Sequence, residues 1–483
     1  MKTLESCWIE MQIKTKDAVV QVFPQVMGFN WLVPFESPEQ GAGKGSGFFI
    51  DDQGHFLTNY HVIEQAKNIQ IQVPCLGRER LDTEIVGVCP ERDLALLRVT
   101  DEVAARIRSV LGSIPFLPFG NSDLIKRGEE ILALGYPLGE EHLKSAQGIV
   151  SGREYVDLND QMCLQVTAPI NDGNSGGPSI NQAGEVIGIN FAGVNEAQNI
   201  GFVIPISDSV KAIKNLYTIP LLRKQDLGAF FCSLSAEMAQ YLKSPLDGGF
   251  YIVSVGKNSL LEKAGIRDGD VLYKVDGFVL DHFGEMLVPW SEDKVAITEI
   301  LNRHEIGDIL KLEIYRNGKK MEFSCVLDFD CVLPIRIMYP EFEYIDYEVI
   351  GGMVVMELAL NHLPLLLKFC QSAEAAATLY KYYALKNRYA PVLVVTQVLA
   401  TSSIDKLRDF LPGTLIELLN DQKVTTLKEF RDAVKKSKKS GYLTLRTQDK
   451  RVVVLPVATL LKEEERLSKL FLYQRSMLLE ELR

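Results

Sequence analysis

The sequence predicts a mainly β protein, in which a barrel or sandwich of short strands is followed by two copies of a small α/β module. Short, often β-branched runs such as Gly47–Ile50 and Val186–Phe191 recur through the first 220 residues, and turn residues bound each run. Glycine is dense around 41–54, 135–152 and 173–201, which indicates tight turns and close approaches of the backbone.

The two α/β modules are predicted by an internal repeat beyond residue 220. Residues 264–277 read AGIRDGDVLYKVDG, and the run FLPGTLIELLND echoes them, with Gly413 lying 144 residues after Gly269 and Asn420 lying 144 residues after Asp276. Each copy reads as a turn, an apolar strand and a second turn, followed by a helical segment and a closing strand. Two copies at this spacing indicate tandem domains rather than a solenoid.

The chain therefore divides into four expected parts: a barrel domain at 1–220, a first small module at 221–334, a second at 335–459 and a helix at 460–483. The first boundary follows a helical pattern that reaches Pro220. The last part carries Leu, Phe and Met at helical spacing among charges of both signs. This pattern predicts an amphipathic helix that docks on a neighbouring domain or subunit rather than on a membrane.

Composition excludes several classes of protein. The chain has 483 residues, 47% hydrophobic and 24% charged, so it can bury cores and is not disordered. Its 63 acidic against 52 basic residues give a net charge of −11, which argues against binding nucleic acid or an anionic membrane. No run approaches the roughly 18 apolar residues of a spanning helix. The N-terminal residues lack the apolar core of an export signal, which predicts a cytoplasmic chain.

The eight cysteines include no C-x-x-C pair. They lie mostly in apolar runs, where we expect reduced, buried thiols and a reducing compartment. No spacing of His, Cys and Asp suggests a metal site, and no cofactor is expected.

The segment at 168–178, APINDGNSGGP, carries the first sign of chemistry. Glycines on both sides of Ser175 permit unusual dihedral angles and expose the hydroxyl. The backbone amides of Gly173, Asn174 and Ser175 are expected to converge into an oxyanion hole, which stabilises the charge that develops during acyl transfer.

A serine needs a base, and His61 follows an apolar strand in the run FLTNYHVI. Asp93 stands at the head of the buried strand LALLRV, where an acid is costly unless it is paired, and pairing with His61 would explain it. Glu91 is the competing acid, but it lies further from the apolar run. Among Ser-His-Asp hydrolases, the chain order His61, Asp93, Ser175 goes with a double β-barrel.

With these residues in place, the chain resembles the HtrA/Deg (Do-like) family of serine proteases. The resemblance is carried by the runs GSGFFI, TNYHVI, DLALL, GNSD, ALGYPLG, QGIVSG, GNSGGP and GIN, which cover nearly the whole first domain. It implies a chymotrypsin/trypsin-like double barrel followed by two PDZ domains. The second PDZ domain, with a helical insertion around 358–389, is most similar to the plant Deg type. Ser175 would be the nucleophile, His61 the general base and then acid, and Asp93 the orienting acid.

The substrate pocket is expected to be small and uncharged. Trypsin-like pockets that accept Arg or Lys carry an acid six residues before the serine, and that position is Pro169 here. A small or medium aliphatic P1 residue is therefore predicted, in a pocket lined by Pro169, Ile170, Asn190, Phe191, Ala192 and Gly193. The resemblance places regulatory loops at about 136–146, 153–162 and 192–199, which can misplace an oxyanion hole until they are ordered.

PDZ domains bind a peptide as an added strand, with its terminal carboxylate held by backbone amides. In the first module the residues expected to do so are Leu227, Gly228, Ala229 and Phe230. The equivalent in the second module is the run 350–353, where the insertion puts peptide binding in question.

Two functions remain open. The first is an ATP-independent serine endopeptidase that degrades unfolded or damaged proteins in protein quality control, regulated by its PDZ domains. The second is a non-proteolytic holdase chaperone or peptide-binding scaffold. The resemblance implies homo-oligomers built from trimers, and the stretch 23–35, with Phe29 and Trp31, supplies either a subunit contact or core packing. The family resemblance implies a periplasm or an organelle lumen as the alternative location.

Overall fold

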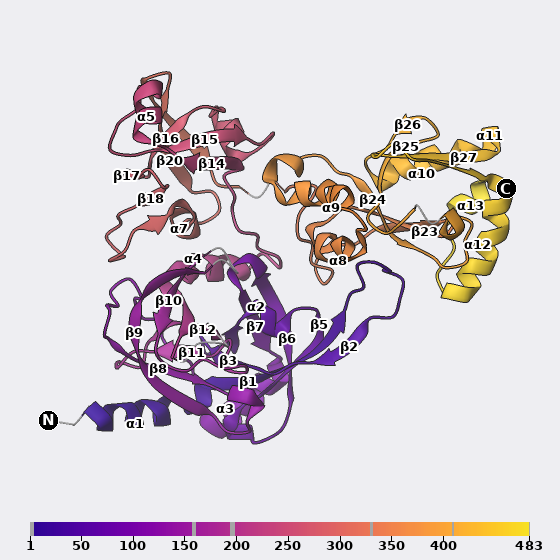
Figure 1. The fold of residues 1–483 in the computed structure, drawn as a ribbon. Helices are drawn as coiled ribbons and strands as arrows, with labels where there is room; N and C mark the ends of the chain where they lie inside the picture. Colours follow the sequence, from indigo (N-terminus) through magenta and orange to yellow (C-terminus); the bar gives the residue numbers. More distant parts are fainter. Residues whose placement is uncertain (1–3, 157–160, 194–198, 329–331, 408–409, 483) are drawn as a thin grey trace. The chain divides into compact units, whose positions relative to one another are not determined.

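The computed structural model describes residues 4–156, 161–193, 199–328, 332–407 and 410–482 (Figure 1). It divides into two compact units. Unit 1 consists of Met1–Met27 and Gln40–Asp330, and unit 2 consists of Gly28–Glu39 and Cys331–Arg483. Each unit is described by itself.

The first barrel of unit 1 closes because its first strand pairs with strands on both sides, β3 and β5. Apolar side chains fill it; Phe48, Phe56, Leu57 and Leu96 are completely buried. Its strands, in the order of the ring, are β1 (Val19–Gly28), β3 (Gly45–Phe49), β4 (His55–Thr58), β7 (Leu94–Val99), β6 (Leu81–Cys89) and β5 (Ala66–Gln72), and β2 (Glu39–Ala42) lies outside β1.

The second barrel is also closed, which confirms the predicted double β-barrel. Ile131, Val166, Ile187 and Val203 are completely buried inside it. Its strands, in the order of the ring, are β10 (Gln161–Val166), β13 (Gly201–Pro205), β12 (Val186–Gly193), β11 (Pro178–Ile180), β8 (Glu130–Gly135) and β9 (Lys144–Val156). Around the two barrels lie α1 (Leu4–Thr15), α2 (Tyr60–Ile63), α3 (Asp101–Leu111) and α4 (Ile206–Leu216).

The remainder of unit 1 is the first α/β module. Its sheet has the order β14 (Ala229–Ser233), β15 (Phe250–Val255), β16 (Val271–Val275), β20 (Ile309–Arg316) and β21 (Lys319–Val326), and its helices are α5 (Ala236–Leu242), α6 (Leu260–Ala264) and α7 (Ile297–Asn302). The short strands β17 (Phe278–Val279), β18 (Glu285–Met286) and β19 (Val295–Ala296) complete it. Among the described strands, β14 pairs with β15 alone, so it forms an edge.

Unit 2 repeats this module, as the sequence predicts. Its sheet has the order β22 (Tyr347–Ile350), β23 (Met353–Glu357), β24 (Leu393–Val398), β25 (Leu415–Leu419), β27 (Tyr442–Thr447) and β28 (Val452–Pro456), with β26 (Gln422–Lys423) beside β25 and with α10 (Leu427–Lys435) and α11 (Ser437–Ser440). β25 lies 144 residues after β16, and the turns that follow both strands contain a residue with positive φ, Asp276 at 49° and Asn420 at 47°.

The helical insertion of unit 2 contains α8 (Leu363–Leu366) and α9 (Ala373–Tyr380), separated by a 3-10 turn. The aromatic residues before β2 pack in this unit too. The rings of Phe29 and Trp31 are 5.0 Å apart, and Trp31 lies edge-on at 5.2 Å from the ring of His362. Because Trp31 is only 7% exposed, core packing explains this stretch better than a subunit contact does.

The C-terminal part differs from the single helix expected at 460–483. It forms α12 (Val457–Phe471) and α13 (Leu478–Leu482), because Leu472 takes a left-handed conformation with φ 57° and ends the first helix. α12 buries Leu460 and Leu467, as its amphipathic pattern predicts, but it also buries Glu464.

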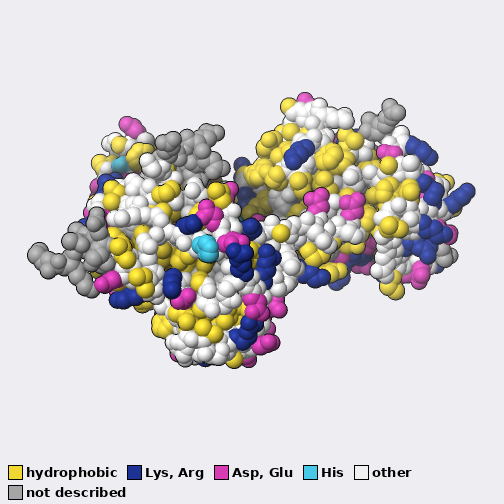
Figure 2. Space-filling model, turned by 90° about the horizontal axis from the view of Figure 1, so that it is seen from below, with side chains coloured by type: hydrophobic (Ala, Val, Ile, Leu, Met, Phe, Trp, Pro, Cys, Tyr) yellow, Lys and Arg dark blue, Asp and Glu magenta, His cyan; other side chains and the backbone are white. Residues whose placement is uncertain are grey.

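The outer surface carries charges of both signs, and only three of the six described cysteines, Cys89, Cys163 and Cys325, are buried as expected. In Figure 2 Lys and Arg side chains lie scattered among Asp and Glu, with hydrophobic side chains exposed between them. None of the described helices is both long and apolar enough to cross a membrane. Six of the eight cysteines have described side chains, and all six are free thiols; burial raises the pKa of Cys89 to about 12.

Candidate active site

His61 and Asp93 form a closely bonded pair. His61 belongs to α2, the single helical turn that directly follows β4. Its Nδ1 is 2.7 Å from Oδ2 of Asp93, and its backbone N–H donates to Oδ1 at 2.7 Å. Since a carboxylate only accepts, Nδ1 carries the proton and Nε2 is left as the basic atom.

The turn before β7 explains how Asp93 reaches this position. Residues Pro90–Arg92 form a 3-10 turn, and Asp93 follows it in the left-handed region with φ 53°. Its N–H donates to the carbonyl of Pro90 at 3.0 Å, and its own carbonyl accepts the Asn59 side chain at 3.1 Å. The Asp93 side chain is 4% exposed, so pairing with His61 satisfies an acid that is otherwise costly to bury. The competing acid, Glu91, pairs with Arg223 at 3.1 Å instead.

Opposing effects act on the protonation of His61. Burial disfavours the imidazolium and would lower its pKa, but the hydrogen bond and the charge of Asp93 outweigh burial, and Glu64 and Asp172 act in the same direction. The pKa of His61 is therefore raised above its ordinary value. A base whose cation is stabilised in this way suits proton transfer near neutral pH.

Ser175 lies in the turn between β10 and β11, close to the end of β4, which precedes the helical turn that carries His61. A Cβ on the next residue, Gly176, would lie 3.0 Å from the amide nitrogen of Asn59, two residues before His61. The Ser175 hydroxyl donates to the carbonyl of Phe191 at 3.0 Å, and the Phe191 ring centre is 6.2 Å from that of His61. No hydrogen bond joins the side chains of Ser175 and His61, both of which lie in the described part of the chain.

The loop before Ser175 provides two amides rather than the three expected. The Asn174 N–H donates to the carbonyl of Asn171 at 2.9 Å, so the prediction that Asn174 contributes to an oxyanion hole is wrong. Among the described residues, the amides of Gly173 and Ser175 have no hydrogen-bond acceptor. Gly173 has φ 95°, and a Cβ there would lie 2.4 Å from the Tyr136 carbonyl oxygen, so only glycine fits.

Ser46, which sequence reasoning did not single out, fixes this loop. Its hydroxyl donates to the Gly173 carbonyl at 2.6 Å and accepts the Tyr136 N–H at 2.9 Å. Both bonds are buried, and together they hold the Gly173 carbonyl against the β3 side of the loop. The GSG run at 45–47 is part of the resemblance, but the role of its hydroxyl depends on a contact 127 residues along the chain.

The side chains of four predicted pocket residues are described, and they differ in burial and in their contacts. Ile170 is buried in the core of the second barrel, and a Cβ on Gly201 would lie 2.6 Å from its Cγ1. Pro169 is exposed, and Phe191 is buried beside Ser175. Asn190 is wrong as a pocket residue, because its completely buried amide donates to the Leu134 carbonyl at 3.0 Å and accepts the Ser179 hydroxyl at 2.7 Å.

Other pocket and loop residues lie outside the described part of the structure. The side chains of Ala192 and Gly193 are not described, and neither are residues 157–160 and 194–198, which belong to two of the expected regulatory loops. No group of three or more His, Cys, Asp or Glu that could hold a metal ion occurs among the described residues.

The first α/β module has an open sheet edge, and in the loop 226–228 beside it one backbone amide is already hydrogen-bonded within the chain. Leu227 and Gly228 are buried, Ala229 begins β14, and Phe230 is 57% exposed. The Gly228 N–H donates to Oδ1 of Asp226 at 2.8 Å. A carboxylate from the chain itself thus occupies one of the amides expected to hold a peptide carboxylate.

The second module fills the corresponding edge with its own strand. β22 pairs antiparallel with β23, with Tyr347 opposite Met356 and Ile350 opposite Met353. Arg431 of α10 binds this strand through Glu348 at 2.8 Å and through the neighbouring Asp346 at 2.6 and 2.8 Å.

The glycine turn of this module also has an internal partner. The Gly351 N–H donates at 3.0 Å to Oε2 of Glu464, which lies on α12. The expected peptide site at 350–353 is therefore occupied by the chain itself.

Comparisons with known proteins agree with this geometry. Residues 45–189 match the trypsin-like peptidase domain family, and residues 342–476 match a PDZ domain family. A protein of Marinomonas sp. (strain MWYL1) named "Probable periplasmic serine endoprotease DegP-like" is 30% identical over 298 residues, which cover 60% of this chain and 58% of that protein. The solved structure of the HtrA-type protease AlgW with decapeptide is 26% identical, with a TM-score of 0.51, over 66% of this chain and 98% of that one.

The trypsin-like peptidase match, the PDZ match and these DegP-like and HtrA-type proteins together support the HtrA/Deg family of serine proteases for this chain. A Chlamydia trachomatis (serovar D) protein with the same name as the Marinomonas one is 27% identical over 420 residues, which cover 86% of this chain and 74% of that protein. The chain thus spans more than half of the length of each of these relatives.

The expected cytoplasmic location is wrong. The HtrA/Deg relatives from Marinomonas, Chlamydia trachomatis and Pseudomonas putida are named periplasmic endoproteases, which points to a compartment outside the cytoplasm. The expectation relied on the lack of an apolar stretch near residue 1, and such a lack does not identify a compartment.

Proposed function

We propose that this chain is an ATP-independent serine endopeptidase that cleaves unfolded or damaged polypeptides. Ser175 acts as the nucleophile, His61 as general base and then general acid, and Asp93 as the group that orients His61. The observation that carries the proposal is the double hydrogen bond of Asp93 to His61, at 2.7 Å to both the ring and the backbone nitrogen. This arrangement leaves Nε2 free to take a proton from a serine hydroxyl.

The reaction begins when the Ser175 hydroxyl turns from the Phe191 carbonyl toward His61 Nε2, which takes its proton as Oγ attacks the substrate carbonyl carbon. The oxyanion is stabilised by the amides of Gly173 and Ser175. His61 then gives the proton to the leaving amine, and an acyl-enzyme forms. A water molecule, deprotonated by His61, then attacks the acyl carbon; as the bond to Ser175 Oγ breaks, His61 returns the proton to Oγ and the acyl group leaves as a carboxylic acid.

The pocket supports a preference for Val, Ala or Ile at P1. The side chain of Ile170 already occupies the space beside Gly201, and Pro169 replaces the acid of pockets that accept Arg or Lys. A long or charged P1 side chain would have neither room nor a partner there.

The assembly and the PDZ domains complete the proposal. We expect homo-oligomers built from trimers, as the family resemblance implies. The open edge of β14 would receive an extended segment of the substrate by strand addition. The edge of the second module, already covered by β22, would instead act in regulation or assembly.

A non-proteolytic holdase is the second candidate, and one observation favours it. The Ser175 hydroxyl donates to the Phe191 carbonyl rather than to His61. A chain that kept this arrangement while it bound unfolded protein would hold its substrate without cleaving it.

Cleavage of casein by variants of the full chain separates the two candidates. Ser175→Ala should abolish cleavage with fold and oligomeric state unchanged, whereas Ser151→Ala, an exposed serine of β9, should cleave like wild type. Suppression of aggregation should persist in both. Equal casein turnover by wild type and Ser175→Ala would refute the protease assignment and leave the holdase.

A further inference from the structure

Arg92, the residue before Asp93, forms a hydrogen bond that links the turn 90–93 to the first α/β module. Its side chain is 7% exposed and therefore needs partners for its charge. Nη1 donates to the carbonyl of Asn302 at 2.8 Å and reaches the carbonyl of Asp208 at 3.4 Å. Asn302 is the last residue of α7, so a cation next to the catalytic acid binds the end of a helix from another module, where cations are favoured.

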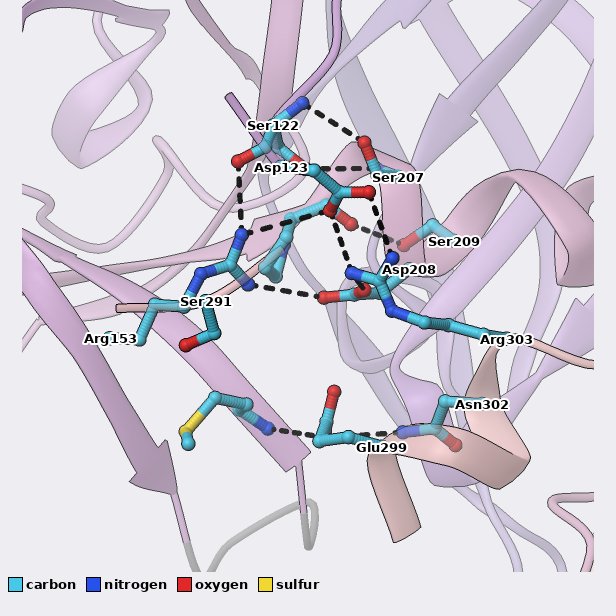
Figure 3. Close-up of polar contacts among 12 residues, drawn as sticks. Ser122, Asp123, Arg153, Ser207, Asp208, Ser209, Ser291, Glu299, Asn302 and Arg303 are labelled. Carbon is cyan, nitrogen blue, oxygen red and sulfur yellow. Dashed lines mark hydrogen bonds and ion pairs between the residues drawn. The ribbon is translucent and has the colours of Figure 1, made fainter. Parts of the chain in front are cut away.

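The end of α7 is itself fixed to the barrels by an ionic cluster (Figure 3). Arg303 donates to both carboxylate oxygens of Asp123, at 2.9 and 2.7 Å, and also binds Asp208. Arg153 lies 3.5 Å from the other oxygen of Asp208. The side chains of this cluster are at most 23% exposed, so solvent screens their charges only weakly.

A second contact fixes the same helix to β10. Glu299 of α7 accepts the Met162 N–H at 3.0 Å, and the amide of Asn302 approaches the same oxygen at 3.4 Å (Figure 3). Since α7 is held on both sides, the Asn302 carbonyl offers Arg92 a fixed acceptor rather than a mobile one.

The turn that carries Asp93 depends on such external support. Asp93 is in the left-handed region, which a residue other than glycine adopts only at a cost. Apart from the two bonds to His61, it is held by its own turn and by the Asn59 side chain. Arg92 supplies the remaining link, from the turn to a second module.

We propose that Arg92 is a positioning residue for the catalytic acid: by binding the Asn302 carbonyl, it holds the turn 90–93 in the geometry in which Asp93 receives both hydrogen bonds from His61. The inference rests on the proposed protease function. It also makes the first PDZ module a structural support of the active site, since α7 supplies the acceptor.

Loss of Arg92 has a defined chemical consequence. When the turn relaxes, Asp93 orients the imidazole less well and stabilises its cation less, so the pKa of His61 falls toward its ordinary value. Proton transfer from Ser175 slows, which lowers kcat. KM stays unchanged because Arg92 does not contact the substrate.

The test compares Arg92→Ala, Arg92→Lys and Arg98→Ala in the full chain. Arg98 is a matched control, since it lies on β7 six residues away and pairs with the exposed Asp101. For Arg92→Ala we expect kcat on a peptide substrate to fall about tenfold or more with KM unchanged. The fall of kcat on the acidic side of its pH profile (the acidic limb), which reflects protonation of His61, should move to lower pH. Arg92→Lys, which keeps one donor, should recover most of kcat, and Arg98→Ala should match wild type.

An unchanged kcat and acidic limb in Arg92→Ala would overturn the proposal. If that variant fails to fold, Arg303→Ala, which frees α7 without altering the turn, must reproduce the loss of kcat; wild-type kcat in that variant would overturn it as well. The His61 imidazole titration, followed by NMR in histidine-labelled chains, tests the coupling even if the wild type cleaves nothing. Failure of the proposed function and failure of this inference are thus distinguishable.

Discussion

Glu464, buried between α12 and the glycine turn of the second module, makes the stability of unit 2 depend on pH. Burial raises its pKa to about 7, although the Tyr473 hydroxyl and the Gly351 N–H both donate to it. In the unfolded chain the same group titrates at its ordinary pKa of 4.5. The folded state therefore favours the protonated acid, and its stability is complete below pH 4.5 and declines as the pH rises through 7.

The size of this effect follows from the shift. A difference of about 2.5 pKa units corresponds to about 3 kcal/mol of unfolding free energy, lost between pH 4.5 and about 7. Glu464→Gln keeps an oxygen that can accept one of the two hydrogen bonds but cannot ionise. At pH 8 this variant should be more stable than wild type by up to about 3 kcal/mol, and near pH 4.5 the two should be similar.

Denaturant unfolding at pH 5 and pH 8 measures this difference. Trp31, the one tryptophan of unit 2, reports on this unit when the other two tryptophans are replaced by Phe. Glu465→Gln, whose exposed side chain pairs with Lys469, is the control and should follow wild type. An equal decline in stability with pH for Glu464→Gln and wild type would refute the reasoning.

Three further predictions concern catalysis. Cleavage should fall as the pH drops below the raised pKa of His61, because the base must be neutral; Asp93→Asn should lower this pKa and reduce kcat by a factor of about 10³ to 10⁴, and a pH profile with an unchanged acidic limb would contradict this. Ser46→Ala removes the hydrogen bond to the Gly173 carbonyl, so kcat should fall about tenfold with KM unchanged, and steady-state kinetics on one peptide would expose a loss confined to KM. Ile170→Gly should widen the pocket and shift preference from Val toward Phe at P1, which a library of matched peptides measures; an unchanged ranking would rule out this position as a determinant.

The double barrel, the repeated module and the pairing of His61 with Asp93 can be predicted from sequence because their signals are local. The turn residues around Ser175 and the acid that begins an apolar strand at Asp93 each imply a structural reason for their presence. The order of His61, Asp93 and Ser175 along the chain then indicates a double β-barrel among the known kinds of Ser-His-Asp hydrolase. The repeat is equally local, since β16 and β25 contain the matching runs.

The remaining features depend on contacts between distant parts of the chain. Nothing in the sequence near Asn174 shows that its backbone N–H donates to the Asn171 carbonyl, or that the side chain of Asn190 donates to the Leu134 carbonyl. β22, which covers the edge of the second module, is bound by Arg431, more than 80 residues away along the chain. Such pairings follow from tertiary packing rather than from pattern.

Labelling of the full chain with a fluorophosphonate, in the presence of unfolded casein, tests the central claim most directly. An adduct mapped by mass spectrometry to Ser175, absent from Ser175→Ala and strongly slowed in His61→Ala, is the predicted result. No adduct on Ser175 in the wild type, or equally fast labelling in His61→Ala, would contradict the assignment of this serine and this histidine as nucleophile and base.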